Sequence, residues 1–262
     1  MAFQAEATQA GTDTKPFRKQ YRLFHATFAQ FCYTGAQVAI AGAFINYVTE
    51  TRVTRNGRLT DSSEASKFLA GAQGAFTLGR FIGSALMKYV KPRWVFFAFL
   101  TLVIIFLIPT ITERGNTGMS MLFIVLFFES IIFPTIVALG MRGLGKYSKR
   151  GSGFIVAGVS GGAVVPPLLF VAADAQGAVN QLTGHAPTAT AMSVPLAFMV
   201  AALSYPICVN FVPAYRNVAD SFSETKLGIR NAAANDPENL VGGHTKGDPS
   251  AHTETVQMDQ KI

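Results

Sequence analysis

Four long windows without a charged residue constrain this 262-residue chain more than any other feature. No Asp, Glu, Lys or Arg occurs in 23–49, 94–112, 151–173 and 175–215. An α-helix needs about 20 apolar residues to cross a bilayer, and each window is about that long or longer. Only 14% of the residues are charged, whereas soluble domains average about 25%. The pattern therefore predicts an all-α membrane protein and excludes a single soluble domain.

The apolar segments predict six transmembrane helices. Their expected ranges are 23–48, 67–89, 94–111, 118–141, 151–173 and 191–212. Residues 1–20 are expected to be the remnant of a cytoplasmic loop, and 21–213 a six-helix transmembrane bundle. Because residues 214–262 are polar and contain few apolar side chains, they are expected to form a disordered cytoplasmic tail.

Lys and Arg residues are distributed unevenly over the loops. If the N-terminus is cytoplasmic, eleven of them lie near the cytoplasmic side and five near the opposite side. Such an excess predicts that both termini are cytoplasmic, in a multi-pass protein of the plasma membrane. The net charge of +7 comes from these flanking residues and not from a nucleic-acid-binding surface, so no nucleic-acid partner is expected. The first twenty residues lack the apolar stretch of a signal peptide.

Glycines occur four residues apart inside two predicted helices. Gly79 pairs in this way with Gly83, and Gly158 with Gly162. This spacing lets two helix backbones approach closely in lipid, where packing must supply the association. We expect these glycines to serve helix packing, the alternative being sliding gates in a transporter.

Prolines interrupt three of the predicted helices. Pro134, Pro166-Pro167 and Pro206 each remove a backbone donor and bend or break a helix. A membrane tolerates such breaks only where protein or water satisfies the freed groups. Several broken helices in one bundle favour a transport pathway, and Pro134 is included among the gating or packing residues.

Glu129 is the most informative single residue. A carboxylate near the middle of a span costs about 2.5–3.5 kcal/mol on insertion scales, so it needs a partner or a use. We expect Glu129 to bind substrate or carry the coupled proton, with a structural bond between helices as the alternative. Arg80 is the obvious counter-charge, unless its side chain extends towards the basic loop instead. Phe133, one turn after Glu129, is a further candidate for substrate binding.

Polar and aromatic side chains form a stripe on the first predicted helix. Steps of three and four residues join Gln30, Tyr33, Gln37, Ala41 and Phe44. Amides bond to sugar hydroxyls and an aromatic ring covers the apolar face of a sugar, so the stripe predicts a sugar-binding surface. Ordinary polar contacts between helices are the alternative.

Asn46 is also a candidate for substrate binding, although it lies half a rotation from Gln37 on an ideal helix. It joins the stripe only if the helix unwinds around Gly42.

The motifs of other functional classes are weak. Ser160 lies in a Gly-x-Ser-x-Gly sequence, but no strand precedes it and no histidine is expected at membrane depth, so no catalytic residue is assigned. Cys32 and Cys208 lie in apolar windows and are interpreted as small core residues. No His, Cys or Asp cluster has metal-ligand spacing. We therefore expect no enzyme activity, no metal and no cofactor.

Three stretches of the sequence are distinctive. They are FCYTGAQVAIAGAFINYVTE (31–50), GRFIGSALMKYVKPR (79–93) and FFESIIFPTIVALGMRGLGKYSKRGSGFIVAGVSGGAVVPPLLFVAAD (127–174). Together they resemble the C-terminal half of the fucose/galactose/glucose–proton symporter family, the L-fucose permease group of the major facilitator superfamily. By this resemblance the six spans correspond to helices seven to twelve of a twelve-helix transporter. The spans that hold Gln37 and Glu129 then line the central cavity.

Two features depart from the family pattern. The usual acidic residue in the loop between helices eight and nine has no counterpart before Lys88, which argues against gating by that charge pair. The N-terminal half, on which the family's proton-coupling acids are mostly expected, is missing.

The resemblance implies transport of a sugar of the fucose, galactose or glucose class by proton-coupled alternating access. The chain is expected to act as the C-terminal half of such a transporter and not to be competent alone. Its expected partners are the sugar, the proton, the lipid bilayer, and a missing N-terminal half or a second copy of itself. The alternative is a non-transporting six-helix membrane protein that pairs with or regulates a full-length transporter.

Overall fold

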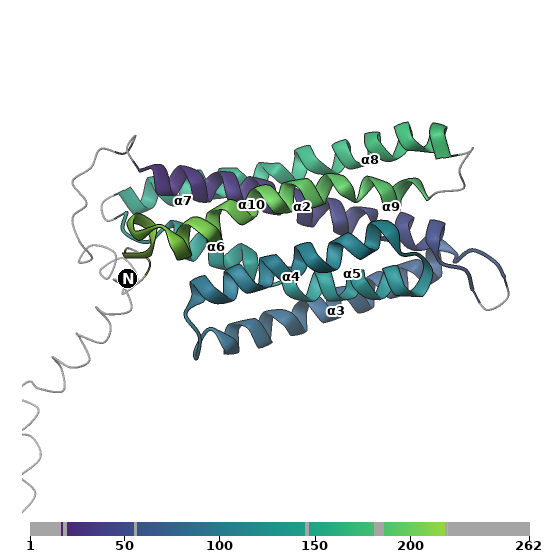
Figure 1. Ribbon diagram of the computed structural model, residues 1–262, viewed down its shortest axis with the longest axis horizontal. Coiled ribbons are helices and arrows are strands. Elements are labelled where there is room, and N and C mark those ends of the chain that lie inside the picture. Colours follow the sequence, from purple (N-terminus) through teal and green to yellow (C-terminus); the bar gives the residue numbers. More distant parts are fainter. Residues whose placement is uncertain are drawn as a thin grey trace, which may run out of the picture. The chain divides into compact units, whose positions relative to one another are not determined.

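Long helices follow one another along the chain in the computed structural model (Figure 1). The structure describes residues 17, 20–54, 57–144, 147–180, 186–217 and 219, and all statements below concern them. The first three helices are α2 (Tyr21–Thr51), α3 (Ser62–Leu86) and α4 (Pro92–Thr112). The rest are α5 (Gly115–Glu129), α6 (Ile132–Gly140), α7 (Ser148–Ala157), the 3₁₀ turn η3 (Gly158–Ser160), α8 (Gly161–Asn180), α9 (Pro187–Ala191) and α10 (Ser193–Phe211).

Five segments are long and apolar enough to cross a membrane. They are 21–51, 92–112, 115–140, 148–176 and 187–211. Each overlaps an expected span, and the all-helical membrane architecture is confirmed to this extent. The expected second span, 67–89, corresponds to α3, whose sequence does not reach the same apolarity because it includes Lys67, Gln73 and Arg80. The count of six spans therefore stays a prediction.

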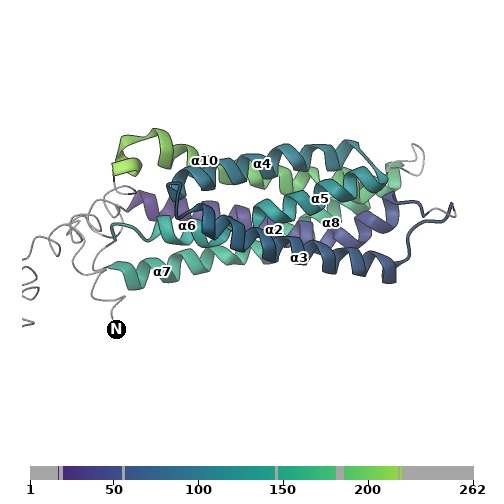
Figure 2. The same cartoon turned by 90° about the horizontal axis from the view of Figure 1, so that it is seen from below.

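Helix α2 runs through the middle of the bundle (Figure 1). It packs against α3, α5, α6, α7, α8, α9 and α10, and many of its buried positions are alanine or glycine. Small side chains allow this many neighbours to approach one helix. In contrast, α3 packs mainly on α5 and α2 and lies on an outer face (Figure 2). Most of its side chains are exposed outside this bundle.

The fourth expected span, 118–141, is two helices and not one. The first, α5, begins at Gly115, whose φ of +66° favours glycine. It ends at Glu129, and α6 resumes at Ile132. Pro134 is in the first turn of α6, and its ring removes the N–H that would otherwise bond to a carbonyl four residues earlier, in the break. The interruption therefore lies in the middle of an apolar segment.

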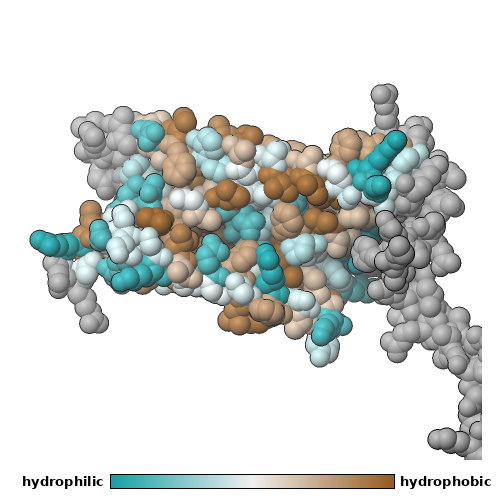
Figure 3. Space-filling model, turned by 180° about the vertical axis from the view of Figure 1, so that it is seen from behind, coloured by the Kyte–Doolittle hydropathy of each residue, from teal (hydrophilic) through white to brown (hydrophobic). Residues whose placement is uncertain are grey.

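The outside of the bundle is mixed in character. Apolar residues cover much of the face in Figure 3, and polar residues interrupt them between the two ends. Exposed large apolar side chains occur on several helices, among them Phe81 of α3, Val156 of α7 and Val171 of α8. Exposed apolar surface of this extent fits lipid or another helical domain.

The end of α10 is tied to the start of α2. Tyr215 bonds to Nδ1 of His25 at 3.2 Å, and Nε2 of His25 lies 2.9 Å from the Ser204 hydroxyl. The Arg142 guanidinium donates to the carbonyl of Ala219 at 2.6 Å. The expected tail, 214–262, thus starts with residues that contact the bundle. The region beyond residue 219, and all of 1–20 except Phe17 and Gln20, lies outside the described residues.

Candidate functional site at the break between α5 and α6

Glu129 is the last residue of α5 and is fully buried, with an exposed fraction of 0%. Neither oxygen of its carboxylate has a hydrogen-bond partner among the described residues. A buried polar group without a partner is costly and is rare in folded proteins. Glu129 is therefore a free acceptor pair at membrane depth, available to a hydroxyl or to a proton.

Side chains of neighbouring helices donate hydrogen bonds to the backbone carbonyls of the helix break. Pro134 has no N–H, so the Ser130 carbonyl four residues earlier loses its helical donor. The Nε–H of Arg80 donates to that carbonyl at 3.4 Å. The Tyr33 hydroxyl donates to the Glu129 carbonyl at 2.5 Å. Side chains of α2 and α3 therefore satisfy the carbonyls of Glu129 and Ser130 at the break.

Ser130 completes this arrangement from within the break. Its hydroxyl donates to the Phe127 carbonyl at 2.8 Å, and its side chain is buried. The hydroxyl of Thr135 likewise donates to the Ile131 carbonyl at 2.7 Å. We did not identify Ser130 or Thr135 as site residues from the sequence. The signal that identifies them is a hydroxyl residue close to Pro134, since Ser and Thr side chains in helices bond carbonyls of the preceding turn.

Arg80 reaches the break through the backbone and not through the carboxylate. No ion pair of 4.0 Å or less joins Arg80 to Glu129, although the structure describes both residues. The guanidinium instead lies 4.9 Å from the centre of the Phe76 ring. Arg80 is exposed outside this bundle, whereas Glu129 is buried inside it. Arg80 therefore does not neutralise the Glu129 carboxylate through a direct ion pair.

Glycines allow two close contacts between helices in this bundle. A Cβ added to Gly79 would collide with the Phe127 carbonyl, and one added to Gly83 would press on Ile131. The first contact lets α3 approach the break closely enough for Arg80 to reach it.

The second contact lies between α2 and the turn into α8. Gly158 faces the Thr27 carbonyl, and a Cβ on Gly161 would collide with the Phe31 carbonyl. Gly162 lies more loosely against Val38. This contact joins the two helices by backbone approach.

The stripe expected on α2 is not on a single open face. Gln30, Tyr33 and Phe44 are buried inside the bundle. Gln37 is half buried, and Asn46 is exposed. Helix α2 continues through Gly42, so Asn46 does not join the stripe by unwinding.

The buried members of the stripe have partners within the bundle. The hydroxyl of Tyr33 bonds to the Glu129 backbone, and the amide of Gln30 donates to the Thr34 hydroxyl at 3.0 Å. Phe44 packs edge-on against Phe123 at 6.0 Å between ring centroids. Of the sequence-predicted residues, the structure thus brings Tyr33, Arg80 and Glu129 together.

The remaining candidates lie near the break or apart from it. Phe133 is half buried and Pro134 exposed, both in the first turn of α6. Ser160 is exposed in the 3₁₀ turn, while the ring nitrogens of His25 bond to Ser204 and Tyr215. Among the described residues, no group of three His, Cys, Asp or Glu could hold a metal ion.

Comparison with known proteins identifies relatives. A putative glucose/galactose transporter of Helicobacter pylori is 32% identical over 203 residues, which are 77% of this chain and 45% of that protein. A glucose/galactose transporter of Brucella abortus is 33% identical over 161 residues, covering 60% and 38% of the two chains. The L-fucose-proton symporter of Escherichia coli is 33% identical over 164 residues, covering 63% and 35%. No protein-family profile matches the sequence.

Solved structures that resemble this chain include the same E. coli symporter. A crystal structure of a variant of the E. coli fucose:proton symporter, FucP, matches with a TM-score of 0.62 and 28% identity, over 73% of this chain and 45% of that one. FucP in its outward conformation, described as a major facilitator superfamily transporter, matches with a TM-score of 0.63 over 76% and 47%. The chain thus spans less than half the length of these relatives. The resemblance expected from the sequence is confirmed: the chain is a homologue, over part of their length, of the glucose/galactose transporters and L-fucose–proton symporters of the major facilitator superfamily.

Proposed function

We propose that this chain is the C-terminal six-helix half of a proton-coupled sugar transporter. The relatives supply the substrate class, because they are named for glucose, galactose and fucose. The chain spans 45% of the length of the H. pylori relative, and the half is our proposal for that part. In this proposal α3 also crosses the bilayer, as the second of six spans, and both termini of this plasma-membrane protein are cytoplasmic. Helix α3 has few contacts within the bundle, which fits a helix that packs against an N-terminal six-helix half.

The observation that carries the proposal is the buried carboxylate of Glu129. It lies in a broken helix, and both its oxygens lack a partner among the described residues. Transporters of alternating access place substrate and coupling-ion sites at such discontinuous helices near the bilayer midplane. We assign proton coupling to Glu129, because its side chain points into the bundle rather than onto the uncovered face of α2. A proton taken up there removes the cost of an unpaired charge.

The sugar site belongs, in this proposal, to side chains at the uncovered surface. Gln37 of α2 is half buried, and its amide can donate and accept. Phe133 of α6 is half buried and offers a ring to the apolar face of a sugar. Tyr33 connects the two regions, since its hydroxyl bonds to the backbone of Glu129. In this proposal, proton uptake by Glu129 changes the break between α5 and α6, and the bond from Tyr33 transmits that change to α2.

Sugar uptake tests the proposal. The chain is expressed in cells that lack sugar transporters, alone and together with the N-terminal six-helix half of the H. pylori relative. We expect saturable uptake of labelled galactose, glucose or fucose only with both halves, because six helices supply one wall of the pathway. Saturable uptake by this chain alone would contradict the half-transporter. Loss of uptake by a co-expressed complete transporter would favour the regulatory alternative.

Replacement of the carboxylate tests the proton role. Glu129→Gln keeps the shape and the hydrogen-bonding capacity but cannot take up a proton. We expect the variant to reach the membrane at the normal level and to exchange sugar across it, but to lose accumulation driven by a pH gradient. Glu113→Gln, an exposed carboxylate after α4, is the matched control and is expected to change nothing. Unaltered pH dependence in the Glu129 variant would reduce that residue to a packing role.

A further inference from the structure

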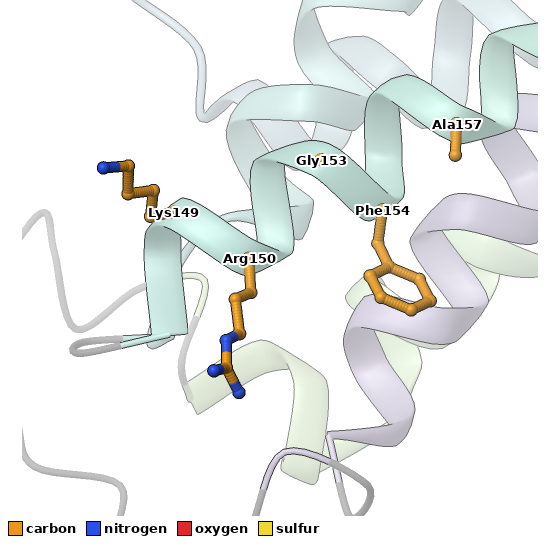
Figure 4. Close-up of a pocket in the computed structure, with 5 residues that line it drawn as sticks. All are labelled: Lys149, Arg150, Gly153, Phe154 and Ala157. Carbon is orange, nitrogen blue, oxygen red and sulfur yellow. The ribbon is translucent and has the colours of Figure 1, made fainter.

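A shallow pocket of about 390 Å³ lies on the outer side of α7, away from the break between α5 and α6. Lys149, Arg150, Gly153, Phe154 and Ala157 line it. In Figure 4, Arg150 and Phe154 extend from the same side of the helix, and Lys149 leaves its first turn in another direction. The pocket therefore has a basic entrance at the helix start and an apolar wall one to two turns further along.

The apolar wall is part of an aromatic cluster. The Phe154 ring lies 5.3 Å from that of Phe17 and 5.6 Å from that of Phe24, and Phe17 contacts Tyr147 at 5.7 Å. Although it has these neighbours, Phe154 is 43% exposed. Tyrosine is enriched at the headgroup level of membrane proteins. Tyr147 of the cluster and the basic first turn of α7 fit a pocket near lipid headgroups.

The positive charge at the entrance is not neutralised by the part of the protein that the structure describes. Neither Lys149 nor Arg150 pairs with an acidic group among the described residues. Both lie in the first turn of α7, where the helix dipole disfavours cations. The described acidic residues other than Glu129 belong to the opposite end of the bundle: Glu50, Asp61, Glu64, Glu113 and Asp174. An external anion would complement this entrance.

We propose that this pocket binds one anionic phospholipid. The phosphate would bind the guanidinium of Arg150, with Lys149 adding positive charge from the same helix turn, and an acyl chain would follow Phe154, Gly153 and Ala157. A guanidinium matches phosphate oxygens in geometry as well as charge. Basic pockets beside transmembrane helices favour lipids that carry a net negative charge. The inference does not rest on sugar transport, and it concerns a different face of the bundle.

Lipid retention measured by native mass spectrometry tests the site. The full chain is purified in detergent and mixed with phosphatidylglycerol or phosphatidylcholine of the same acyl chains. We expect the chain to retain one phosphatidylglycerol preferentially. Lys149→Gln and Arg150→Gln are each expected to weaken that binding about five-fold, as one basic group near an anionic surface does. Equal retention of the two lipids by the unchanged chain would overturn the proposal.

A charge-matched control separates the pocket from the general basic character of its end. Lys88→Gln combined with Arg216→Gln removes two positive charges from the same end outside the pocket. We expect this pair to leave phosphatidylglycerol binding unchanged. If it weakens binding as much as the Lys149 and Arg150 changes, the pocket is not the site. Competition by inorganic phosphate as strong as by the lipid would identify a site for free anions and also overturn the proposal.

A second variant fills the pocket without changing charge. Gly153 has open space around its Cβ position, so Gly153→Leu occupies the pocket without a clash in the bundle. We expect it to abolish the preference for phosphatidylglycerol. Gly74→Leu on α3 is the matched control, because Gly74 is equally open and outside the pocket. Unchanged lipid retention in Gly153→Leu would contradict the site even if the charge variants failed to fold.

Discussion

Replacement of Tyr33 by phenylalanine tests how the break between α5 and α6 is held. The Tyr33 hydroxyl donates to the Glu129 carbonyl at 2.5 Å, and its ring is fully buried. Removing the hydroxyl leaves a buried carbonyl without this donor, which costs about 1–3 kcal/mol in proteins. Side-chain hydrogen bonds inside membranes average about 0.6 kcal/mol and reach about 1.7. We therefore expect Tyr33→Phe to lower the free energy of unfolding by about 1–2 kcal/mol.

The assay is reversible unfolding of the full chain in mixed detergent micelles, followed by circular dichroism. Tyr89→Phe is the matched control, because Tyr89 is 89% exposed after α3. We expect the control to unfold like the unchanged chain. If Tyr33→Phe is indistinguishable from Tyr89→Phe, the Tyr33 hydroxyl does not stabilise the break, and the reasoning about its bond to the Glu129 carbonyl fails.

Two further changes probe packing and loop structure by the same unfolding assay. Gly161→Ala is expected to cost about 1–3 kcal/mol because its Cβ would collide with the Phe31 carbonyl, whereas Gly153→Ala, in open space, is expected to be neutral or stabilising. Arg52→Ala is expected to cost about 1 kcal/mol, because Arg52 donates to Glu64 at 2.9 Å, to Asn116 at 2.8 Å and to Thr60 at 3.2 Å. Arg58→Ala, an exposed control in the same loop, is expected to leave stability unchanged; a loss equal to that of Arg52→Ala would contradict the role given to these bonds.

The helices could be predicted closely from the distribution of charge. Segments without Asp, Glu, Lys or Arg have few alternatives to a helix inside a bilayer, so their ends fall near the charged residues that bound them. The weakest segment was the second, in which Lys67, Gln73 and Arg80 interrupt the apolar pattern. Its helix exists, but its apolarity alone does not identify it as a span. Whether such a helix faces lipid depends on what packs against it.

The side-chain contacts of the site could not be predicted from spacing. The stripe of polar residues on α2 suggested one surface, yet Tyr33 bonds to a carbonyl and Gln37 lies at the partly covered edge. Helical periodicity gives the angle of a side chain on its own helix but not the neighbour that it meets. Likewise, Arg80 and Glu129 are opposite charges on adjacent helices, and the sequence left open whether they pair or whether Arg80 extends towards the basic loop. The proline supplied a competing acceptor, the Ser130 carbonyl, that no charge pattern reveals.

The break between α5 and α6 also shows why one residue type is needed at each position around it. Glycine at 79 admits the Phe127 carbonyl, proline at 134 frees the Ser130 carbonyl, and tyrosine at 33 is long enough to reach the backbone of Glu129 from another helix. Of the side chains around the break, Tyr33 and Arg80 donate to backbone carbonyls, and neither reaches the carboxylate. A helix that merely tolerated an acid would direct one of these donors to its side chain, since that removes the larger desolvation cost. Because the Tyr33 and Arg80 donors bond to the backbone, the Glu129 carboxylate has no hydrogen-bond partner among the described residues, as the proposed proton exchange requires.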